Sequence, residues 1–439
     1  MPGHSTPGGS QRRKKPDGRA PYNGRLDRPS RMQTSGRIAF TYPNFRAYML
    51  ARFLATASSE MQSVAVAWQV YGLTHRPLEL GVVGLAQFLP GVLLFLVAGQ
   101  TADRVPRQRI LQVCLAGFAA CSGLLLFFAL RGVASVFPIY GVLVLNGLTR
   151  AFNGPASQAF LPLLVEERDF PNAVAWSSSI FQASTVLGPA AGGLLYGFFA
   201  SPVPVYALAA VNCVIASVLV SGLRLAKPQR PRGTARVAVV LEGLRYIWRN
   251  QLILGAISLD LFAVLLGGAV ALLPVFADRI LHVGAIGLGV MRSAPGAGAV
   301  LMAIVLAYRP LRRRAGAIML WCVFGFGLFT IVFGISRNLP LTIAALLLVG
   351  ACDMVSVVVR HTLVQLGTPD EMRGRVSAVN MVFIGASNEV GQFESGLTAQ
   401  WWGAAPAVIG GGFGTIAVVV AWALLFPALR RVDRLTAKA

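Results

Sequence analysis

Ionisable side chains stand inside long apolar stretches of this 439-residue chain, and these are the residues that could carry chemistry. Glu60, Asp260 and Asp353 fall inside predicted membrane spans, as do Arg150 and Arg360. A charged group at the centre of a membrane helix costs roughly 2.5–3.5 kcal/mol, so such residues are candidates for function. Burial also favours the protonated form of a carboxylate, which is what exchange of a proton near neutral pH requires.

A structural role for each acid, as the neutralising partner of an arginine, stays open at this stage. Asp353 and Arg360 are seven residues apart, so on one helix they share a face about 10 Å apart along the axis. They need not touch each other. Glu389 and Glu394 are further acids in apolar surroundings, but they are weaker candidates.

The sequence offers little that would support catalysis or metal binding. Five cysteines fall inside apolar runs, and none has the spacing of a metal site or a redox pair. Four scattered histidines form no HExxH motif, and neither a P-loop nor a dinucleotide-binding glycine motif follows a strand. We therefore predict a protein that is not an enzyme and that uses no cofactor and no metal.

The elements that must position these residues are membrane-spanning helices. Hydrophobic residues make up 55% of the chain and charged residues only 13%, about half the charged fraction of a soluble domain. Each helix that crosses a bilayer needs about 20 apolar residues. The sequence predicts an all-α membrane protein with twelve such spans, at 47–73, 79–101, 110–130, 134–164, 173–199, 204–223, 252–278, 284–307, 315–335, 340–366, 376–402 and 405–428.

The net charge of +22 could suggest nucleic-acid binding, but the distribution of the cations indicates membrane topology instead. With both termini in the cytoplasm, 31 of the 39 Lys and Arg residues lie in cytoplasmic segments and 4 in outer turns. Cations collect in cytoplasmic loops of membrane proteins, so we predict this orientation and no nucleic-acid partner. The basic N-terminal tail lacks the apolar stretch of a signal peptide, although it could contact anionic lipid headgroups.

The two halves of the chain form an internal repeat. Gly84 and Pro90 recur as Gly289 and Pro295, and Arg104 recurs as Arg309, each at an offset of 205 residues. Parallel repeats of this kind flank a central substrate site in transporters. We predict two six-helix bundles with flanking segments, divided as a disordered cytoplasmic tail at 1–43, a bundle at 44–223, a cytoplasmic linker at 224–250, a second bundle at 251–428 and a cytoplasmic tail at 429–439.

The turn after the second span resembles the loop motif of the major facilitator superfamily, Gly-x-x-x-Asp-Arg-x-Gly-Arg. Here Pro106 stands where the family usually has glycine. The resemblance implies a latch that holds the cytoplasmic side closed, in which Asp103 meets the helix N-terminus near Gly374 and the arginines pair with acids after the fourth span. The alternative is that these arginines serve only to fix the membrane topology, as cations of any cytoplasmic loop do. The latch residues are Gly99, Asp103, Arg104, Arg107, Arg109, Glu166, Glu167 and Gly374.

The fifth span resembles the antiporter motif of the drug-exporting branches, with a serine in place of the first glycine. Its small residues allow close helix approach and its proline bends the span; the motif residues are Ser184, Gly188, Pro189, Gly192 and Gly193. A stretch from Asp353 to Gly374 is similar to the enterobactin-exporter and macrolide-efflux-like branch. In the family arrangement, spans 1, 4, 7 and 10 line the cavity, which implies that Glu60, Arg150, Asp260 and Asp353 face it.

The resemblance implies a secondary transporter of a bacterial cytoplasmic membrane that exports amphipathic, drug- or siderophore-like molecules in exchange for protons. Its expected partners are a small-molecule substrate, protons and membrane lipids, and we predict a monomer. An importer of a metabolite, and a sensor or lipid-handling relative that transports nothing, remain alternatives. The span 5 motif favours export over import.

Overall fold

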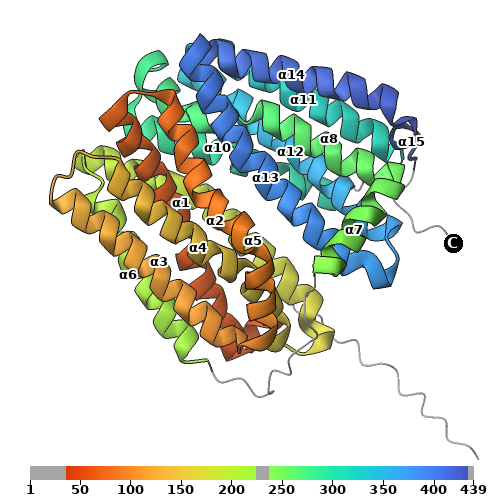
Figure 1. Cartoon of the computed structure of the whole chain (residues 1–439), viewed down its shortest axis with the longest axis horizontal. Coiled ribbons are helices and arrows are strands. Elements are labelled where there is room, and N and C mark those ends of the chain that lie inside the picture. Colours follow the sequence, from red (N-terminus) through yellow and green to blue (C-terminus); the bar gives the residue numbers. More distant parts are fainter. Residues whose placement is uncertain (1–35, 224–236, 310, 312, 434–439) are drawn as a thin grey trace, which may run out of the picture.

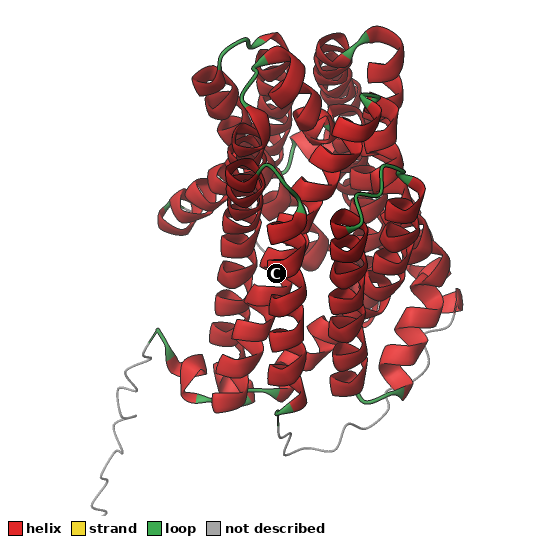
Figure 2. Cartoon of the chain, turned by 90° about the vertical axis from the view of Figure 1, so that its left-hand side faces the viewer, coloured by secondary structure: helices red, strands yellow, loops and turns green. Residues whose placement is uncertain are grey.

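A computed structural model describes residues 36–223, 237–309, 311 and 313–433 of the chain. Across these ranges the regular structure is helical, and no strand occurs in them. The long helices run side by side, with the connecting turns at the two ends of the molecule (Figures 1 and 2). The predicted all-α class is therefore confirmed.

The first half forms one bundle, in which α1 packs against the fifth and sixth helices and α4 packs against the second and third. Short turns connect consecutive helices, so neighbouring helices run antiparallel. The bundle consists of α1 (Pro43–Thr74), α2 (Pro77–Arg104), α3 (Arg107–Leu130), α4 (Phe137–Phe160), α5 (Phe170–Phe199) and α6 (Val203–Ser221), with the short 3₁₀ helices η2 (Leu161–Leu163) and η3 (Glu167–Asp169) before α5.

The second half repeats this arrangement, and the two bundles lie side by side in Figure 1. Its helices are α8 (Gln251–Gly267), α10 (Gly284–Tyr308), α11 (Ala315–Ile335), α12 (Leu339–Gly367), α13 (Asp370–Trp402) and α14 (Ala404–Leu425). The repeat extends to a backbone detail. The first span ends at His75 and its counterpart ends near His282, and both histidines have a left-handed conformation with φ of 51° and 52°.

The seventh predicted span, 252–278, is not one continuous helix. After α8 ends at Gly267, the chain continues through η4 (Ala269–Leu272), α9 (Leu273–Val275) and the π-helical η5 (Phe276–Ile280). Gly268, with ψ of 41°, leaves the helical conformation at the break, and Pro274 cannot donate a backbone hydrogen bond. Apolar content alone could not reveal this break because these residues are as hydrophobic as the rest of the span.

Eight stretches of the described chain are long and apolar enough to cross a membrane by length and composition. The other four long helices, α1, α4, α5 and α13, have 32, 24, 30 and 33 residues. They are long enough to span but carry more polar side chains, so they do not meet the same criterion of apolar composition. The count of twelve spans therefore stays a prediction.

The segments at the ends of the bundles are more ordered than the sequence predicted. Part of the tail expected to be disordered, residues 36–43, contains η1 (Ile38–Thr41), and Asn172 and Trp176 both donate to the carbonyl of Gly36. After α15 (Pro427–Arg430), Asp433 accepts the backbone N–H of Arg314 at 3.0 Å. The rest of the predicted tails, 1–35 and 434–439, lies outside the described residues.

The predicted linker 224–250 includes a further helix, α7 (Val237–Arg249). Ile247 is buried against the beginning of α8 and α13. An ion pair joins Glu242 to Arg375 of α13, and Tyr246 donates its hydroxyl to the carbonyl of Gly367 at 2.9 Å. Residues 224–236 lie outside the described ranges. The described part of the linker is thus fixed to the second bundle.

The bundles are joined most firmly at the end of the molecule opposite both described chain ends. A hydrophobic cluster there combines Val64, Tyr71 and Leu80 of the first bundle with Leu273 and Met291 of the second. The guanidinium of Arg279 lies 5.8 Å from the centroid of the Tyr71 ring, a cation–π contact between the halves. We call this region the closed end, and the region that holds η1, α7 and α15 the terminal end.

Candidate functional site

Glycines bring the backbones of α5 and α10 together where the two bundles meet. A Cβ atom built on Gly193 would lie 2.6 Å from the carbonyl oxygen of Ala285 and 2.6 Å from Cα of Gly289. Any larger residue would force the helices apart, because the blocking atoms belong to the backbone. Ser293 of α10 donates its hydroxyl to the carbonyl of Val186 at 2.7 Å.

The remaining motif residues of α5 pack against α1 within the first bundle. A Cβ on Gly188 would lie 2.6 Å from Cβ of Glu60, and one on Gly192 would lie 2.7 Å from the carbonyl oxygen of Met61. Ser184 is fully buried and donates to a carbonyl of its own helix at 2.9 Å. Pro189 stands inside α5 and presents its carbonyl oxygen to Gly289. The motif therefore fixes α5 to α1 on one side and to α10 on the other.

The second contact between the bundles joins α2 to α13, again at the closed end. A Cβ on Gly81 would lie 2.9 Å from Cα of Phe393, and one on Gly396 would lie 2.9 Å from the carbonyl of Pro77. Toward the terminal end, Gln158 of α4 donates to the sulfur of Met381 at 3.5 Å, a long contact between exposed side chains. Close backbone approaches thus belong to the closed end.

A charged group from each bundle meets between α4 and α13. Nη1 of Arg150 lies 4.0 Å from Oε1 of Glu389, and the two side chains are 56% and 19% exposed. Gln392 donates to the other carboxylate oxygen of Glu389 at 3.0 Å. Further charged neighbours of Glu389 are Glu60 of α1 and Arg292 of α10. We call Glu60, Arg150, Arg292 and Glu389 the interface charge cluster.

The cluster is a place where movement of the bundles changes charge pairing. Arg150 and Glu389 can stay together only while α4 and α13 remain close, because the contact crosses from one bundle to the other. Separation of the helices would break this pair and expose Glu389, which is now 19% exposed, to water or to a substrate. Glu60 also lies directly beside Gly188, so this acid contacts the motif of α5.

The other predicted acids occupy the interior of the second bundle. Arg360 of α12 forms an ion pair with Asp260 of α8, and their side chains are only 3% and 8% exposed. Asp260 and Asp353 line one small cavity together with residues of α11, such as Phe326. The cavity measures about 10 Å³, roughly the volume that holds one water molecule.

This placement differs from the expected exposure of Asp260 to the space between the bundles. A buried guanidinium requires a nearby carboxylate, and the helix packing supplies Asp260 rather than Asp353 as the partner of Arg360. Within the described ranges Asp353 has no ion pair. Two carboxylates thus line one cavity, and only Asp260 of the two is paired with an arginine within the described ranges.

Replacement of Asp260 by leucine should strongly destabilise the protein, because it leaves Arg360 charged and enclosed. Removing one partner of a buried pair costs about 3–5 kcal/mol. The double variant Asp260→Leu, Arg360→Met should recover much of this loss. Thermal unfolding in detergent measures both. A single variant as stable as the wild type would show that Arg360 does not depend on Asp260.

The predicted latch residues lie around the terminal ends of α2, α3 and α4. Arg107 donates to the carbonyl of Ala159 at 2.9 Å, and Glu166 pairs with Arg168 at 3.0 Å. Arg104 and Arg109 are exposed, as is Glu167. Gly99 lies in the last turns of α2, whereas the side chain of Asp103 is outside the described part of the structure.

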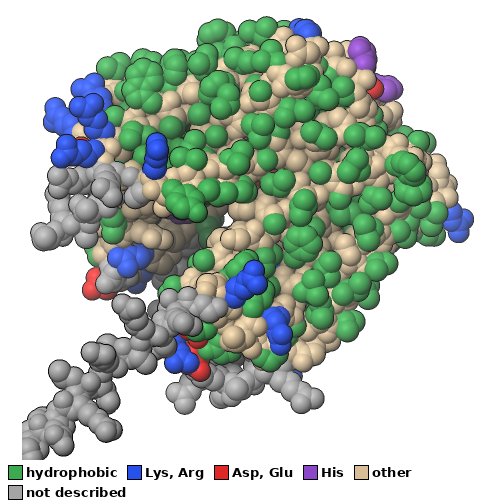
Figure 3. All heavy atoms as spheres, turned by 180° about the vertical axis from the view of Figure 1, so that it is seen from behind, with side chains coloured by type: hydrophobic (Ala, Val, Ile, Leu, Met, Phe, Trp, Pro, Cys, Tyr) green, Lys and Arg blue, Asp and Glu red, His purple; other side chains and the backbone are tan. Residues whose placement is uncertain are grey.

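The helix end that the latch should meet is the start of α13. Among the described residues, no atom lies within 4 Å of a Cβ built on Gly374. Figure 3 shows a hollow in one face of the molecule, on the side where Lys and Arg gather. These features fit a molecule whose bundles are apart at the terminal end and together at the closed end.

Comparison with known families identifies the protein class. The sequence profile of the family described as transmembrane secretion effector matches residues 34–438, nearly the whole chain. The chain belongs to this family. It is therefore a membrane transporter with the major facilitator fold and not an enzyme. The resemblance seen in the loop and span 5 motifs is confirmed at the level of the family.

Proteins named as enterobactin exporters are among the relatives of this chain. The enterobactin exporter EntS of Shigella boydii serotype 18 is 27% identical over 399 residues, which cover 89% of this chain and 94% of the relative. EntS of Escherichia coli O1:K1 has the same identity and coverage. Together with the membrane-spanning helices, these relatives indicate a multi-pass protein of the bacterial inner membrane.

Solved structures share the fold at low sequence identity. A POT family transporter in complex with 5-aminolevulinic acid has a TM-score of 0.70 and 10% identity, covering 88% of this chain and 96% of its own. The nucleoside transporter NupG has a TM-score of 0.64 and 13% identity, covering 88% and 99%. A bacterial homologue of the iron transporter ferroportin, in an inward-facing state, has a TM-score of 0.61 and 16% identity, covering 89% and 99%. These likenesses support the fold alone.

Sequence reasoning did not connect two residues of the interface charge cluster with the other members. Glu389 was a weak candidate, and Arg292 had no assigned role, yet Glu389 faces Arg150 across the bundle contact. A signal was present in the sequence, because each is an ionisable residue within an apolar span. Their relation to Arg150 and Glu60 depends on helix rotation and bundle packing, which spacing along one helix does not provide.

Proposed function

We propose that this transmembrane secretion effector exports amphipathic small molecules from the cytoplasm in exchange for protons, by alternating access between two bundle arrangements. The observation that carries the proposal is the asymmetry of the bundle interface. Glycine contacts such as Gly193 with Gly289 join the bundles at the closed end, while no described atom lies within 4 Å of a Cβ on Gly374 at the terminal end. The described arrangement then corresponds to an inward-open state, with both termini in the cytoplasm.

Proton exchange requires a carboxylate that alternates between charged and neutral forms. Asp353 satisfies this because it lies in the second bundle without an ion-pair partner, beside the occupied pair of Asp260 and Arg360. Coupling also requires charges whose pairing changes when the bundles move. The interface charge cluster supplies such a set. Protonation and substrate binding would favour opposite arrangements of the bundles.

The relatives support the proposed direction of transport and the proposed substrate class. Enterobactin exporters give a named precedent, and the motif of α5 resembles that of exporting branches. We therefore propose a substrate of siderophore-like or drug-like chemistry, transported by a monomer. Cells that lack their other efflux pumps should retain less of such a compound when they express this protein. Faster uptake on expression would instead support an importer.

Replacement of Asp103 by asparagine should reduce transport several-fold while membrane insertion stays normal. A carboxylate at a helix N-terminus contributes about 0.3–1 kcal/mol when exposed and about 2 kcal/mol when partly buried, so its loss disfavours the arrangement closed at the terminal end. Efflux at matched expression measures the effect. Asp278→Asn, at the closed end, is the control and should transport normally. Unchanged efflux by Asp103→Asn would contradict the latch.

A further inference from the structure

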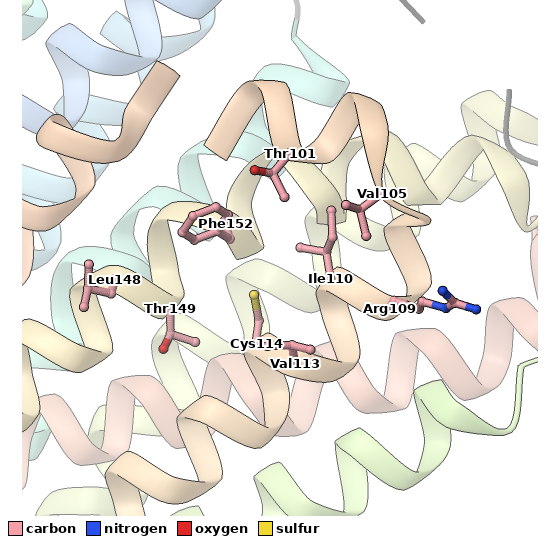
Figure 4. A pocket seen from close by; sticks show the side chains of 9 residues that line it. All are labelled: Thr101, Val105, Arg109, Ile110, Val113, Cys114, Leu148, Thr149 and Phe152. Carbon is pink, nitrogen blue, oxygen red and sulfur yellow. The ribbon is translucent and has the colours of Figure 1, made fainter. Parts of the chain in front are cut away.

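A lateral groove lies between α2, α3 and α4 of the first bundle, near the terminal end. Its volume is about 390 Å³, within the range of about 300–1,000 Å³ that is usual for small-molecule sites. All of its described lining comes from one bundle and contains no member of the interface charge cluster. The lining residues are Thr101, Val105, Arg109, Ile110, Val113, Cys114, Leu148, Thr149 and Phe152 (Figure 4).

The two threonines of this groove offer few free hydrogen-bonding groups to a molecule bound in it. Thr101 donates its hydroxyl to the carbonyl of Val97 at 2.8 Å, and Thr149 donates to that of Leu145 at 2.9 Å. Each hydroxyl is thus satisfied on its own helix, which leaves the interior of the groove hydrophobic. A hydrated ion or a sugar would lose water there without new hydrogen bonds. The interior suits a hydrocarbon chain.

The groove has one blocked end and one cationic rim. At the blocked end, α3 and α4 approach closely, since a Cβ on Gly117 would lie 2.9 Å from Oγ1 of Thr149. At the rim, Arg109 contributes the stem of its side chain, and Figure 4 shows its guanidinium turned away from the apolar lining. Arg104 is exposed on the last turn of α2 nearby. An arginine at the rim can bury its apolar stem in the groove and pair its guanidinium with a lipid headgroup.

The groove opens on an outer side of the bundle. Val113 of α3 is 72% exposed and Val105 is 39% exposed, although both belong to an apolar lining. In a membrane protein such exposed aliphatic side chains face the acyl chains of the bilayer. The rim arginines would then lie at the level of the cytoplasmic headgroups, where anionic lipids concentrate.

We propose that this groove binds one membrane phospholipid with an anionic headgroup. An acyl chain occupies the space between α2, α3 and α4, and the phosphate pairs with Arg109. Charge complementarity selects the lipid class, because the groove combines an apolar interior with a cationic rim. The lipid would contact Thr101, Val105 and Arg109, which belong to the segment that also carries the predicted latch.

Native mass spectrometry of the full-length protein in detergent tests this proposal, with phosphatidylglycerol and phosphatidylcholine of identical acyl chains as probes. The wild type should bind one phosphatidylglycerol about fivefold more tightly than phosphatidylcholine. Val113→Trp, which fills the exposed mouth of the groove, should weaken both lipids at least fivefold. Arg109→Gln should remove the preference for phosphatidylglycerol and leave binding of phosphatidylcholine unchanged.

Two matched variants separate this site from general lipid contact. Val218→Trp places the same ring at a 65% exposed position of α6, and Arg314→Gln removes the repeat counterpart of Arg109, also exposed at the terminal end. Both should bind lipid as the wild type does. Equal lipid binding by Val113→Trp and the wild type would overturn the proposal, as would displacement of phosphatidylglycerol by inorganic phosphate alone. Thermal unfolding of each variant verifies that the fold is intact.

Discussion

Replacement of Asp353 by asparagine is expected to abolish transport driven by a pH gradient while exchange down a substrate gradient continues. Asp353 lines the small cavity in the second bundle, whereas Arg360 pairs with Asp260. The charge of Asp353 can therefore change without leaving a buried arginine unpaired. Asparagine keeps the size of the side chain but cannot release a proton. The protein should therefore still alternate between states but no longer couple that movement to protons.

Proteoliposomes with and without an imposed pH gradient measure this uncoupling. Ser356→Ala, which alters an uncharged residue of the same cavity, is the matched control and should keep coupling. Glu60→Gln should give a milder version, because Glu60 belongs to the interface charge cluster rather than to the cavity. If Asp353→Asn still concentrated substrate in response to the pH gradient, Asp353 would not be the coupling residue.

Replacement of Gly193 by alanine should nearly abolish transport, with at least a tenfold loss, by opening the contact between α5 and α10. The added Cβ would meet backbone atoms of Ala285 and Gly289 at 2.6 Å, and backbone cannot move aside as a flexible side chain can. The described arrangement is thereby disfavoured. Gly154→Ala on α4 is the control, since its Cβ would have no atom within 4 Å.

A distance measurement distinguishes this effect from simple unfolding. Spin labels at Arg76 and His282, both exposed and on different bundles, report the separation of the bundles at the closed end. The labels should move apart in Gly193→Ala and stay at the wild-type separation in Gly154→Ala. A variant that transports normally with unchanged label separation would show that this contact does not limit the transport cycle.

Much of the fold could be predicted, because long hydrophobic runs indicate the helices and the polar turns between them indicate where the helices end. The expected spans overlap the observed helices, and the glycines of the α5 motif indicated close packing before any contact was known. The ordered segments at 36–43 and 237–249 were missed, since polar and basic sequence resembles a solvated tail or linker. Their order depends on distant partners, such as Asn172 for the first segment and Arg375 for the second.

The candidate site could be predicted only as a set of unusual residues. The sequence indicated Asp260, Asp353 and Arg360 as candidates because they are ionisable groups in apolar spans. It could not show that Arg360 pairs with Asp260 of another helix, because spacing along α12 relates Arg360 only to Asp353. The contact of Arg150 with Glu389 could likewise not be predicted from the sequence, because it depends on how the two bundles pack against each other.

The measurement that tests the central claim most directly is proton movement driven by substrate in proteoliposomes that contain only this protein. An internal pH dye records protons while a gradient of enterobactin or of an amphipathic drug is imposed across the bilayer. We predict that substrate flux in one direction moves protons in the other, and that a pH gradient alone concentrates the substrate. Substrate flux without proton movement, or with protons moving in the same direction, would contradict export by proton exchange.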